Sequence, residues 1–462
     1  MAEGSRFERR MSDSDALMWA IEKDPLLRST ITAVALLDQA PDHDRLLAKL
    51  ERGLRMIPRL RQRVASPPFR VAPPQWVVDP RFDLTYHLRF VRAPGDGALR
   101  DLLDLTAPLA MQGFDRARPL WEFTVVEGLA EGRAALVQKV HHSVTDGVGG
   151  IELALMLLDT ERSPSGDPGP LEELTPAEEP TAVDLLREGL EHVRRRQLGI
   201  ARRTLARAPG VARDVPGTVR GTAETVQSLA RLLSPATTPL SPIMTGRSLS
   251  MRFDLLTMPL AEAKAAAKKA GAKLNDAFVA AVAGGLARYH DRHGAPVESL
   301  RMTMPISIRP AEGSSLGGNQ FVPARFPVPV DIVDPVQRMR TIRDLVARQR
   351  AEPALAFTDA IAGVLNRLPT STVTSLFGGM LKGVDFVTTN VPGAPFPVYL
   401  AGAKVEGNFA FAPLSGSAAN IALLSYLDEL QIGINTDPAA VPDADVFVAC
   451  LEEGFEEIRK VA

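Results

Sequence analysis

The stretch KVHHSVTDGVGG, residues 139–150, sets two histidines side by side and follows them with an Asp-Gly pair. Histidine has an unperturbed pKa close to neutrality, so an imidazole that faces a cleft can take a proton from an alcohol. In this interpretation His142 is a general base. Asp146 shapes the turn behind it through hydrogen bonds or an ion pair, and Gly147 permits an unusual backbone angle.

Three other interpretations of this stretch remain. A metal site would need His141, His142 and Asp146 to converge, although adjacent strand residues point to opposite faces and no further ligand spacing is present. We therefore predict no metal. A nucleophile triad using Ser143 lacks the G-x-S-x-G turn that presents such a serine. The third interpretation is purely structural, with both histidines filling a strand end.

The neighbouring elements indicate how the histidines are held. Residues 121–129 (WEFTVVEGL) and 133–142 (RAALVQKVHH) have the pattern of two strands, which the Glu131-Gly132 turn joins into a hairpin. The run 148–160 then predicts a buried helix. The histidines thus lie at a strand end beside a turn, where a rigid scaffold exposes side chains to ligands.

The remainder of the chain alternates strands and helices, which predicts an α/β fold. A strand is expected at 31–38, and an amphipathic helix over 42–60 places its leucines on one face. In the second half we expect a strand near 248–256, helices over 258–271 and 273–294, and a C-terminal helix over 443–462. Further strands are expected at 301–310, 383–393, 398–407 and 420–437, and Asn275 is placed as the N-cap of the second helix.

Length and local composition predict two halves and a connection. A chain of 462 residues is long for one hydrophobic core. The segment 161–184 is rich in Pro, Gly and acidic residues, and a basic helical segment over 185–213 follows it. We favour a helix packed across the surface over one lying on an anionic membrane. The predicted domains are 1–160, the connection 161–245, and 246–462.

Global properties exclude several classes of protein. The formal net charge of -2 gives no overall attraction to nucleic acid. Cys450 is the only cysteine, which excludes an intramolecular disulfide framework and a cysteine-based zinc site. Charges interrupt the N-terminal residues, so no signal peptide is expected. No apolar run reaches the about 20 residues that span a bilayer. We expect any membrane contact to be peripheral.

Several motifs together resemble a known family. HHSVTDG matches the HHxxxDG motif of the CoA-dependent acyltransferase superfamily. The narrower resemblance is to the bacterial wax ester synthase/diacylglycerol acyltransferase family, and it spans nearly the whole chain. The segments that carry it are SDSDALMWAIEKDPLLRSTITAVALLD, PLWEF, LNDAFVAAVAGGLARY, MPISIRP, TTNVPGAPFPVYLAGAKV and SYLDELQIGINTDPAAVPD.

The resemblance implies a fold and a set of site residues. It implies two chloramphenicol-acetyltransferase-like subdomains of mixed sheet and helices, joined by a long linker, with an active-site tunnel between them. His142 corresponds to the general base, with His141, Asp146 and Gly147 as its support. The candidate substrate-binding residues are Pro119, Leu120, Trp121, Asn275 and Asp276. A core aromatic and a helix cap remain the alternatives for Trp121 and Asn275. Asn275 is also a candidate oxyanion donor.

The reaction that the resemblance implies transfers a fatty acyl group from acyl-CoA to diacylglycerol or a long-chain alcohol. It needs no cofactor, since acyl-CoA is a substrate, and it needs no acyl-enzyme. The expected location is cytoplasmic, peripheral to the inner face of the plasma membrane or to lipid inclusions. Two alternatives remain, a lipid-binding protein without turnover and a condensation-domain-like transferase that uses carrier-bound thioesters. Phe278 stands where many relatives carry a smaller β-branched residue, which points to an altered substrate preference.

Overall fold

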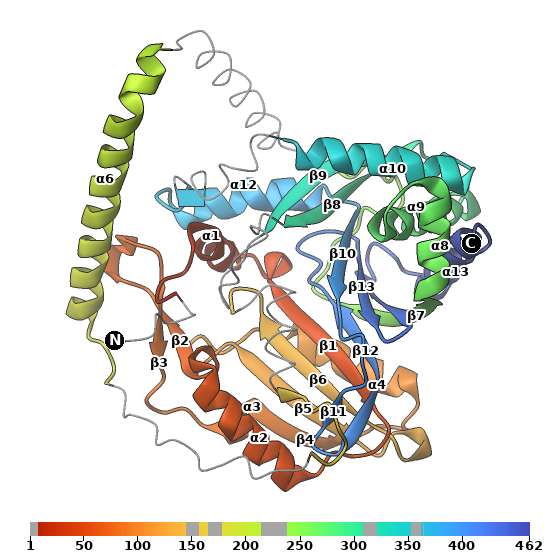
Figure 1. The fold of residues 1–462 in the computed structure, drawn as a ribbon, viewed down its shortest axis with the longest axis horizontal. Coiled ribbons are helices and arrows are strands. Elements are labelled where there is room, and N and C mark those ends of the chain that lie inside the picture. Colours follow the sequence, from red (N-terminus) through yellow and green to blue (C-terminus); the bar gives the residue numbers. More distant parts are fainter. Residues whose placement is uncertain are drawn as a thin grey trace.

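The computed structural model describes residues 8–144, 157–164, 178–213, 238–307, 321–352, 362–363 and 365–462. In this part of the chain two six-stranded sheets lie side by side, with helices packed on both (Figure 1). A separate two-stranded sheet pairs β2 (Gln62–Ala65) with β3 (Gln75–Val78). The α/β fold with two sheet-based subdomains, expected from the sequence, is confirmed.

The first sheet has the strand order β11-β12-β1-β6-β5-β4. Its strands are β1 (Thr30–Leu37), β4 (Leu88–Arg92), β5 (Trp121–Glu127), β6 (Ala134–His141), β11 (Tyr399–Leu400) and β12 (Ala403–Phe411). Helix α2 (His43–Met56) packs its leucines on one face of this sheet, and α4 (Leu99–Met111) covers the other face. Two shorter helices, α1 (Asp13–Ile21) and α3 (Leu84–His87), complete this half.

The second sheet has the order β7-β14-β13-β10-β8-β9. Its strands are β7 (Arg252–Pro259), β8 (Ser299–Ser307), β9 (Phe321–Pro329), β10 (Phe386–Pro392), β13 (Ala419–Tyr426) and β14 (Glu429–Thr436). Its helices are α8 (Leu260–Ala270), α9 (Leu274–Arg292), α10 (Pro335–Arg350), α12 (Thr370–Lys382) and α13 (Ala444–Arg459). The buried faces of α9 and α13 form the largest hydrophobic core with this sheet.

The predicted hairpin is confirmed as β5 and β6. The two strands pair antiparallel from Trp121 opposite Val140 to Glu127 opposite Ala134. Between them Glu131 and Gly132 both have positive φ, 62° and 74°. Glycine adopts this conformation without strain, which suits it to the turn. The register runs without interruption, and β6 ends at His141. The predicted helix over 148–160 lies largely outside the described residues.

The predicted strand over 398–407 is wrong in its extent and in its sheet. Ala401 and Gly402, both with positive φ, divide it into β11 and a longer β12 that runs to Phe411. Strand β12 then pairs antiparallel with β1, from Thr32 opposite Phe411 to Leu37 opposite Val405. Two strands from the second half therefore complete the first sheet, so a boundary near residue 246 does not separate the two sheets cleanly.

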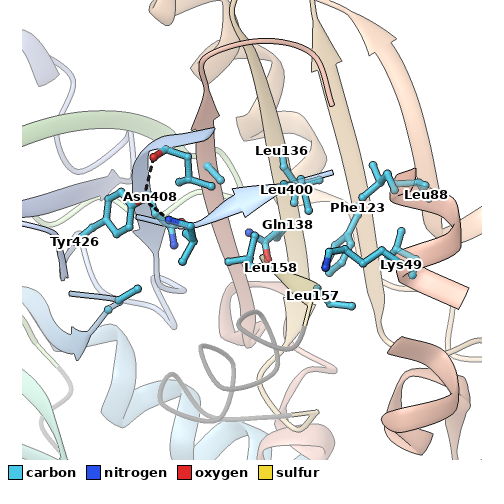
Figure 2. A pocket seen from close by; sticks show the side chains of 17 residues that line it. Lys49, Leu88, Phe123, Leu136, Gln138, Leu157, Leu158, Leu400, Asn408 and Tyr426 are labelled. Carbon is cyan, nitrogen blue, oxygen red and sulfur yellow. Dashed lines mark hydrogen bonds between the residues drawn. The ribbon is translucent and has the colours of Figure 1, made fainter. Parts of the chain in front are cut away.

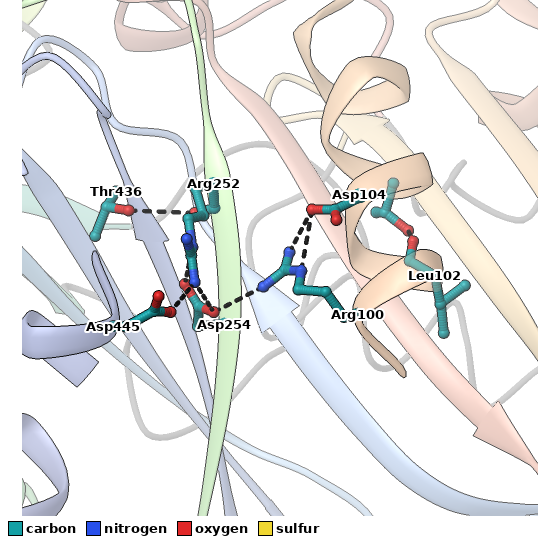
Figure 3. A network of polar contacts seen from close by, with 8 residues as sticks. Arg100, Leu102, Asp104, Arg252, Asp254, Thr436 and Asp445 are labelled. Carbon is teal, nitrogen blue, oxygen red and sulfur yellow. Dashed lines mark hydrogen bonds and ion pairs between the residues drawn. The ribbon is translucent and has the colours of Figure 1, made fainter. Parts of the chain in front are cut away.

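The two halves also meet through α4 and β7 (Figure 3). Arg100 of α4 pairs with Asp104 in its own helix and, at 2.8 Å, with Asp254 of β7. On the other side of Asp254, Arg252 reaches Asp445 of α13. Beside this network Phe253 stacks on Phe411 of β12 with ring centroids 4.1 Å apart. Polar and aromatic contacts thus fix the position of one sheet relative to the other.

The long helix α6 (Ala182–Arg213) runs along the edge of the molecule (Figure 1). It touches the first half through ion pairs of Glu188 with Arg9 and of Arg196 with Asp13. Its position agrees with the predicted helix packed across the surface. Among the helices in the described ranges, none has the length and apolar character needed to cross a membrane.

Candidate active site

The two histidines lie where β6 ends, and two neighbouring segments hold the backbone there. The His141 amide donates to the carbonyl of Leu120 at 3.0 Å, and the His142 amide donates to the carbonyl of Ser29 at 2.8 Å. Opposite His141 in the sheet lies Thr30 of β1. The PLW element and the start of β1 therefore fix the direction in which each histidine side chain leaves the backbone.

Both ring nitrogens of His141 are engaged. Its Nδ1 accepts from the backbone N–H of Ser143 at 3.0 Å, so its Nε2 carries the hydrogen and donates to Glu22 at 2.7 Å. The side chain is 1 % exposed and lies edge-on to Trp19. An imidazole with both nitrogens engaged and no access for a substrate is not free to act as a base. The predicted supporting role of His141 stays a prediction, and its enclosure is consistent with that role.

Glu22 follows α1 and joins the two anchors of the histidine pair. Its Oε1 accepts from the His141 ring and, at 2.7 Å, from the backbone N–H of Ser29, the residue whose carbonyl holds His142. Burial alone would raise the pKa of this carboxyl group. The contacts with His141, Ser29 and Arg116 outweigh burial and lower the pKa below its usual 4.5. Sequence reasoning missed Glu22, because a single acidic residue after an apolar helix has no distinguishing spacing.

Ser143 and His141 approach the geometry of a nucleophile and its base, with Ser143 Oγ 2.7 Å from Nδ1. Burial argues against that role, since Ser143 is 2 % exposed and a substrate carbonyl has no access to it. Cys450 is equally buried, in the core of the second half. Within the described ranges, moreover, no three His, Cys, Asp or Glu side chains gather where they could hold a metal ion.

His142 directly follows β6, which ends at His141. Side chains alternate along a strand, so Leu136, Gln138 and Val140 share the face covered by α2, and His141 lies on the other face. His142 is half-buried, whereas His141 is enclosed. The two remaining motif residues, Asp146 and Gly147, lie outside the described residues. Their predicted support of His142 stays a prediction.

A pocket lies on the α2 face of the first sheet, the face that carries Leu136 and Gln138 (Figure 2). Its empty volume is about 810 Å³, counting the part that opens to solvent. Most of its lining is apolar and comes from the sheet, from α2, from Leu157 and Leu158, and from the residues that follow β10. The lining includes one charged side chain, Lys49, which pairs with Asp159 at 2.6 Å. The Tyr426 hydroxyl, another polar group of the lining, is also engaged, because it donates to the Val405 carbonyl.

Pro119, Leu120 and Trp121 are buried, and none of them lines the pocket. The Trp121 ring stacks on His87 with centroids 4.6 Å apart, and its Nε1 donates to the Leu60 carbonyl at 2.7 Å. This geometry fits the core-aromatic alternative. The PLW element reaches the site through its backbone, because the Leu120 carbonyl holds His141 and Trp121 pairs with Val140. Direct contact of these side chains with substrate stays a prediction.

Asn275 and Asp276 lie in the first turn of α9, and the prediction that Asn275 caps the helix is wrong. The N-cap is Lys273, whose amide donates to the Asp276 carboxylate at 2.8 Å, because an acidic residue in the third helical position can reach back to the cap. Burial raises the pKa of Asp276, despite that hydrogen bond and nearby cations. Asp276 is therefore a cap in this structure, and its contact with substrate stays a prediction.

Asn275 instead contacts a second motif. Its Oδ1 accepts from Nδ2 of Asn390 in the NVPG element at 3.4 Å, and its own Nδ2 faces the Met304 sulfur. Two residues beyond that element's proline, Ala394 lines the pocket. The structure thus brings together motifs more than a hundred residues apart in sequence. Phe278 lies deep in the core of the second half and is not among the residues that line the pocket, so its effect on substrate preference stays a prediction.

Comparison with known proteins assigns this geometry to a family. Residues 11–278 match the wax ester synthase/diacylglycerol acyltransferase catalytic domain, and residues 317–459 match the C-terminal domain of the same family. The chain belongs to the wax ester synthase/diacylglycerol acyltransferase family. A Mycobacterium tuberculosis relative named as a diacylglycerol O-acyltransferase is 39% identical over 100% of this chain and 94% of its own. Another from the same organism is 30% identical over 98% of both chains.

Solved structures share the fold of this family member. The wax ester synthase/diacylglycerol acyltransferase of Marinobacter aquaeolei superposes with a TM-score of 0.62 at 23% identity, over 97% of this chain and 98% of that one. A condensation domain of the calcium-dependent antibiotic synthetase also superposes with a TM-score of 0.62, at 15% identity, over 98% and 95% of the two chains. At these identities the likeness concerns the fold alone.

Proposed function

We propose that this acyltransferase-family protein moves a fatty acyl group from acyl-CoA to the hydroxyl of diacylglycerol or of a long-chain alcohol. The observation that carries the proposal is the division of labour between the histidines. His141 is enclosed and fully bonded, whereas His142, one residue beyond β6, is half-buried. The α2 face of the same sheet holds an apolar pocket. The names of the Mycobacterium relatives support diacylglycerol as the acceptor. The name of the family supports wax ester synthesis as the second activity.

His142 takes the proton from the acceptor hydroxyl as its oxygen attacks the thioester carbonyl carbon. The tetrahedral intermediate then breaks its C–S bond, and the same imidazolium returns the proton to the CoA sulfur. The products are an ester and free CoA. Direct transfer between two bound substrates fits the burial of Ser143 and Cys450, since neither can form an acyl-enzyme. Asn275, whose side chain is held by Asn390, is our candidate donor to the oxyanion.

Peripheral attachment to the inner face of the plasma membrane or to lipid inclusions is part of the proposal. The outer side of α6 exposes Leu190 and Leu198 at 55% and 54%, beside the exposed Arg194 and Arg195. Apolar and cationic side chains on one helical surface favour an anionic lipid interface. A variant with Leu190→Ser, Leu198→Ser, Arg194→Gln and Arg195→Gln should lose flotation with anionic vesicles. Unchanged flotation would remove α6 from the proposal.

Purified protein with palmitoyl-CoA, offered diacylglycerol and hexadecanol in competition, tests the proposed reaction. We expect CoA release that depends on an acceptor, and ester products that name the preferred acceptor. His142→Ala should abolish both signals at an unchanged melting temperature. Binding of palmitoyl-CoA without CoA release would favour a lipid-binding protein. Transfer from a carrier-bound thioester but not from acyl-CoA would favour a condensation-type transferase.

A further inference from the structure

The α2-facing side of β6 is less closely packed than a sheet face in a closed core. Gln138 and Val140 are each half-buried, while Lys139 and His141 are buried on the other face. A covered sheet face normally buries its side chains to crystal-like density. The alternation of half-buried and buried residues therefore indicates space above this side of the strand at Gln138 and Val140, and the half-buried His142 follows directly after the strand.

The neighbouring strand extends this space with apolar side chains. Ile31 and Ala33 of β1 lie directly opposite Val140 and Gln138, and directly opposed residues share a face. Both are also half-buried. We call Ile31, Ala33, Gln138 and Val140 the strip. The strip carries no charge, so it favours a hydrocarbon over a phosphate or another charged group.

The strip ends in the pocket of Figure 2. Gln138 belongs to both, and beyond it Leu136 and Ala35 also line the pocket. We call this pair the floor. Leu136 and Val140 are four residues apart, which is about 13 Å along a strand, and His142 follows Val140 by two residues. Gly53 of α2 leaves room for Leu157 of the lining, because a Cβ on Gly53 would lie 2.5 Å from the Leu157 side chain.

We propose that the strip and the pocket hold one unbranched hydrocarbon chain whose reactive end lies at His142, so that the pocket floor measures chain length. This inference rests on the proposed function for the position of the reactive end. Two substrates carry such a chain, the fatty acyl group of the donor and the alkyl chain of an alcohol acceptor. Ala35 and Leu136 are the length-determining residues, because they face each other at the floor.

The opposed pair allows a test that conserves volume. Ala35→Leu fills the floor, Leu136→Ala empties it, and the double variant restores the total volume with the large side chain on the other strand. Val137→Ala is the matched control, because it removes a buried side chain from the opposite face of the same strand. Melting temperatures report whether each variant is folded.

Two substrate series identify which substrate places its hydrocarbon chain in the pocket. In one, acyl-CoAs from decanoyl to stearoyl are combined with one acceptor, and in the other, alcohols from decanol to octadecanol are combined with palmitoyl-CoA. We expect Ala35→Leu to lower the ratio of kcat/KM for the longest over the shortest chain by about tenfold in one series, with Leu136→Ala shifting it the other way. The double variant should return to the wild-type ratio, and Val137→Ala should leave it unchanged. The series that shifts names the substrate.

Unshifted ratios in both series, in folded and active variants, would overturn the length-measuring pocket and leave the proposed reaction standing. If Ala35→Leu is inactive with every chain, recovery of activity in the double variant supports the pocket and failure to recover contradicts it. If the wild-type protein transfers no acyl group at all, the proposed function fails. Calorimetric binding of the same acyl-CoAs and alcohols to the same variants would then test the chain site alone.

Discussion

The two faces of β6 use the same backbone for opposite purposes. On the α4 face Val137, Lys139 and His141 are 1–2 % exposed, and each polar group is surrounded by aromatic or acidic neighbours. On the α2 face Gln138 and Val140 stay half-buried, and so does His142, which follows the strand. Adjacent histidines of identical chemistry therefore have different surroundings. The difference shows that the place in the fold, and not the residue type, decides how far an imidazole is enclosed.

The largest effect on stability should come from removing the buried side chain of His141. His141→Ala removes one of the hydrogen-bond donors of the buried Glu22 carboxylate, which keeps the Ser29 N–H and Arg116, and it also empties the enclosed space of the imidazole. We expect a loss of about 3 kcal/mol in the free energy of unfolding. Urea denaturation of the variant and the wild type measures it. A loss below about 0.5 kcal/mol, typical of surface positions, would contradict the enclosed role of His141.

Replacing Glu22 by Gln should have an intermediate effect, because the amide keeps the shape but loses the charge. We expect about 2 kcal/mol at neutral pH, together with a lower kcat at unchanged KM, since Glu22 positions the Ser29–His142 contact without touching substrate. Glu22→Asp, which keeps the charge, should recover part of kcat. Equal stability loss with an unchanged kcat would limit Glu22 to a purely structural role.

The Glu22 substitution also predicts a pH dependence. The folded-state pKa of Glu22 is lowered from 4.5, so its contribution to stability is present above the unfolded value and is lost as pH falls through the folded value. The stability difference between the wild type and Glu22→Gln should therefore shrink below about pH 4.5. Denaturation curves recorded from neutral to acidic pH measure it. A difference that grows in acid would show that the carboxyl is protonated in the native protein.

The smallest effect should come from Trp121, which lies opposite Val140 but is buried. Trp121→Phe removes the hydrogen bond to Leu60 and part of the stack on His87. We expect about 1 to 2 kcal/mol of destabilisation and unchanged KM values for both substrates. A raised KM at unchanged stability would instead indicate that Trp121 contacts a substrate.

The sequence predicted the elements that have strong local patterns. The β5–β6 hairpin follows from alternating apolar residues and a Glu-Gly turn, and the strand-end position of the histidines follows from the hairpin. The burial of His141 and the partial exposure of His142 are reported by the structure, and the opposite directions expected from strand geometry stay a prediction because β6 ends at His141. The HHxxxDG, PLW and NVPG motifs and the Asn-Asp helix start, taken in order, were sufficient to predict the family.

Contacts between distant segments could not be predicted. The pairing of β12 with β1 depends on a crossing between sheets that no local pattern encodes. Glu22 meets His141 across 119 positions, and Asn390 meets Asn275 across 115. The helix cap was misassigned because Asn275 and Asp276 are both good capping residues, and the observed start at Leu274 lets Asp276 reach back to Lys273.

The proposed mechanism depends most directly on which histidine takes the proton from the acceptor hydroxyl. Acceptor-dependent release of CoA should be measured for His142→Gln and His141→Gln side by side, with melting temperatures for both. The account predicts that His142→Gln loses about 10² to 10⁴-fold in rate at a wild-type melting temperature, whereas His141→Gln loses mainly stability. A His142→Gln variant that retains full acyl transfer would contradict it.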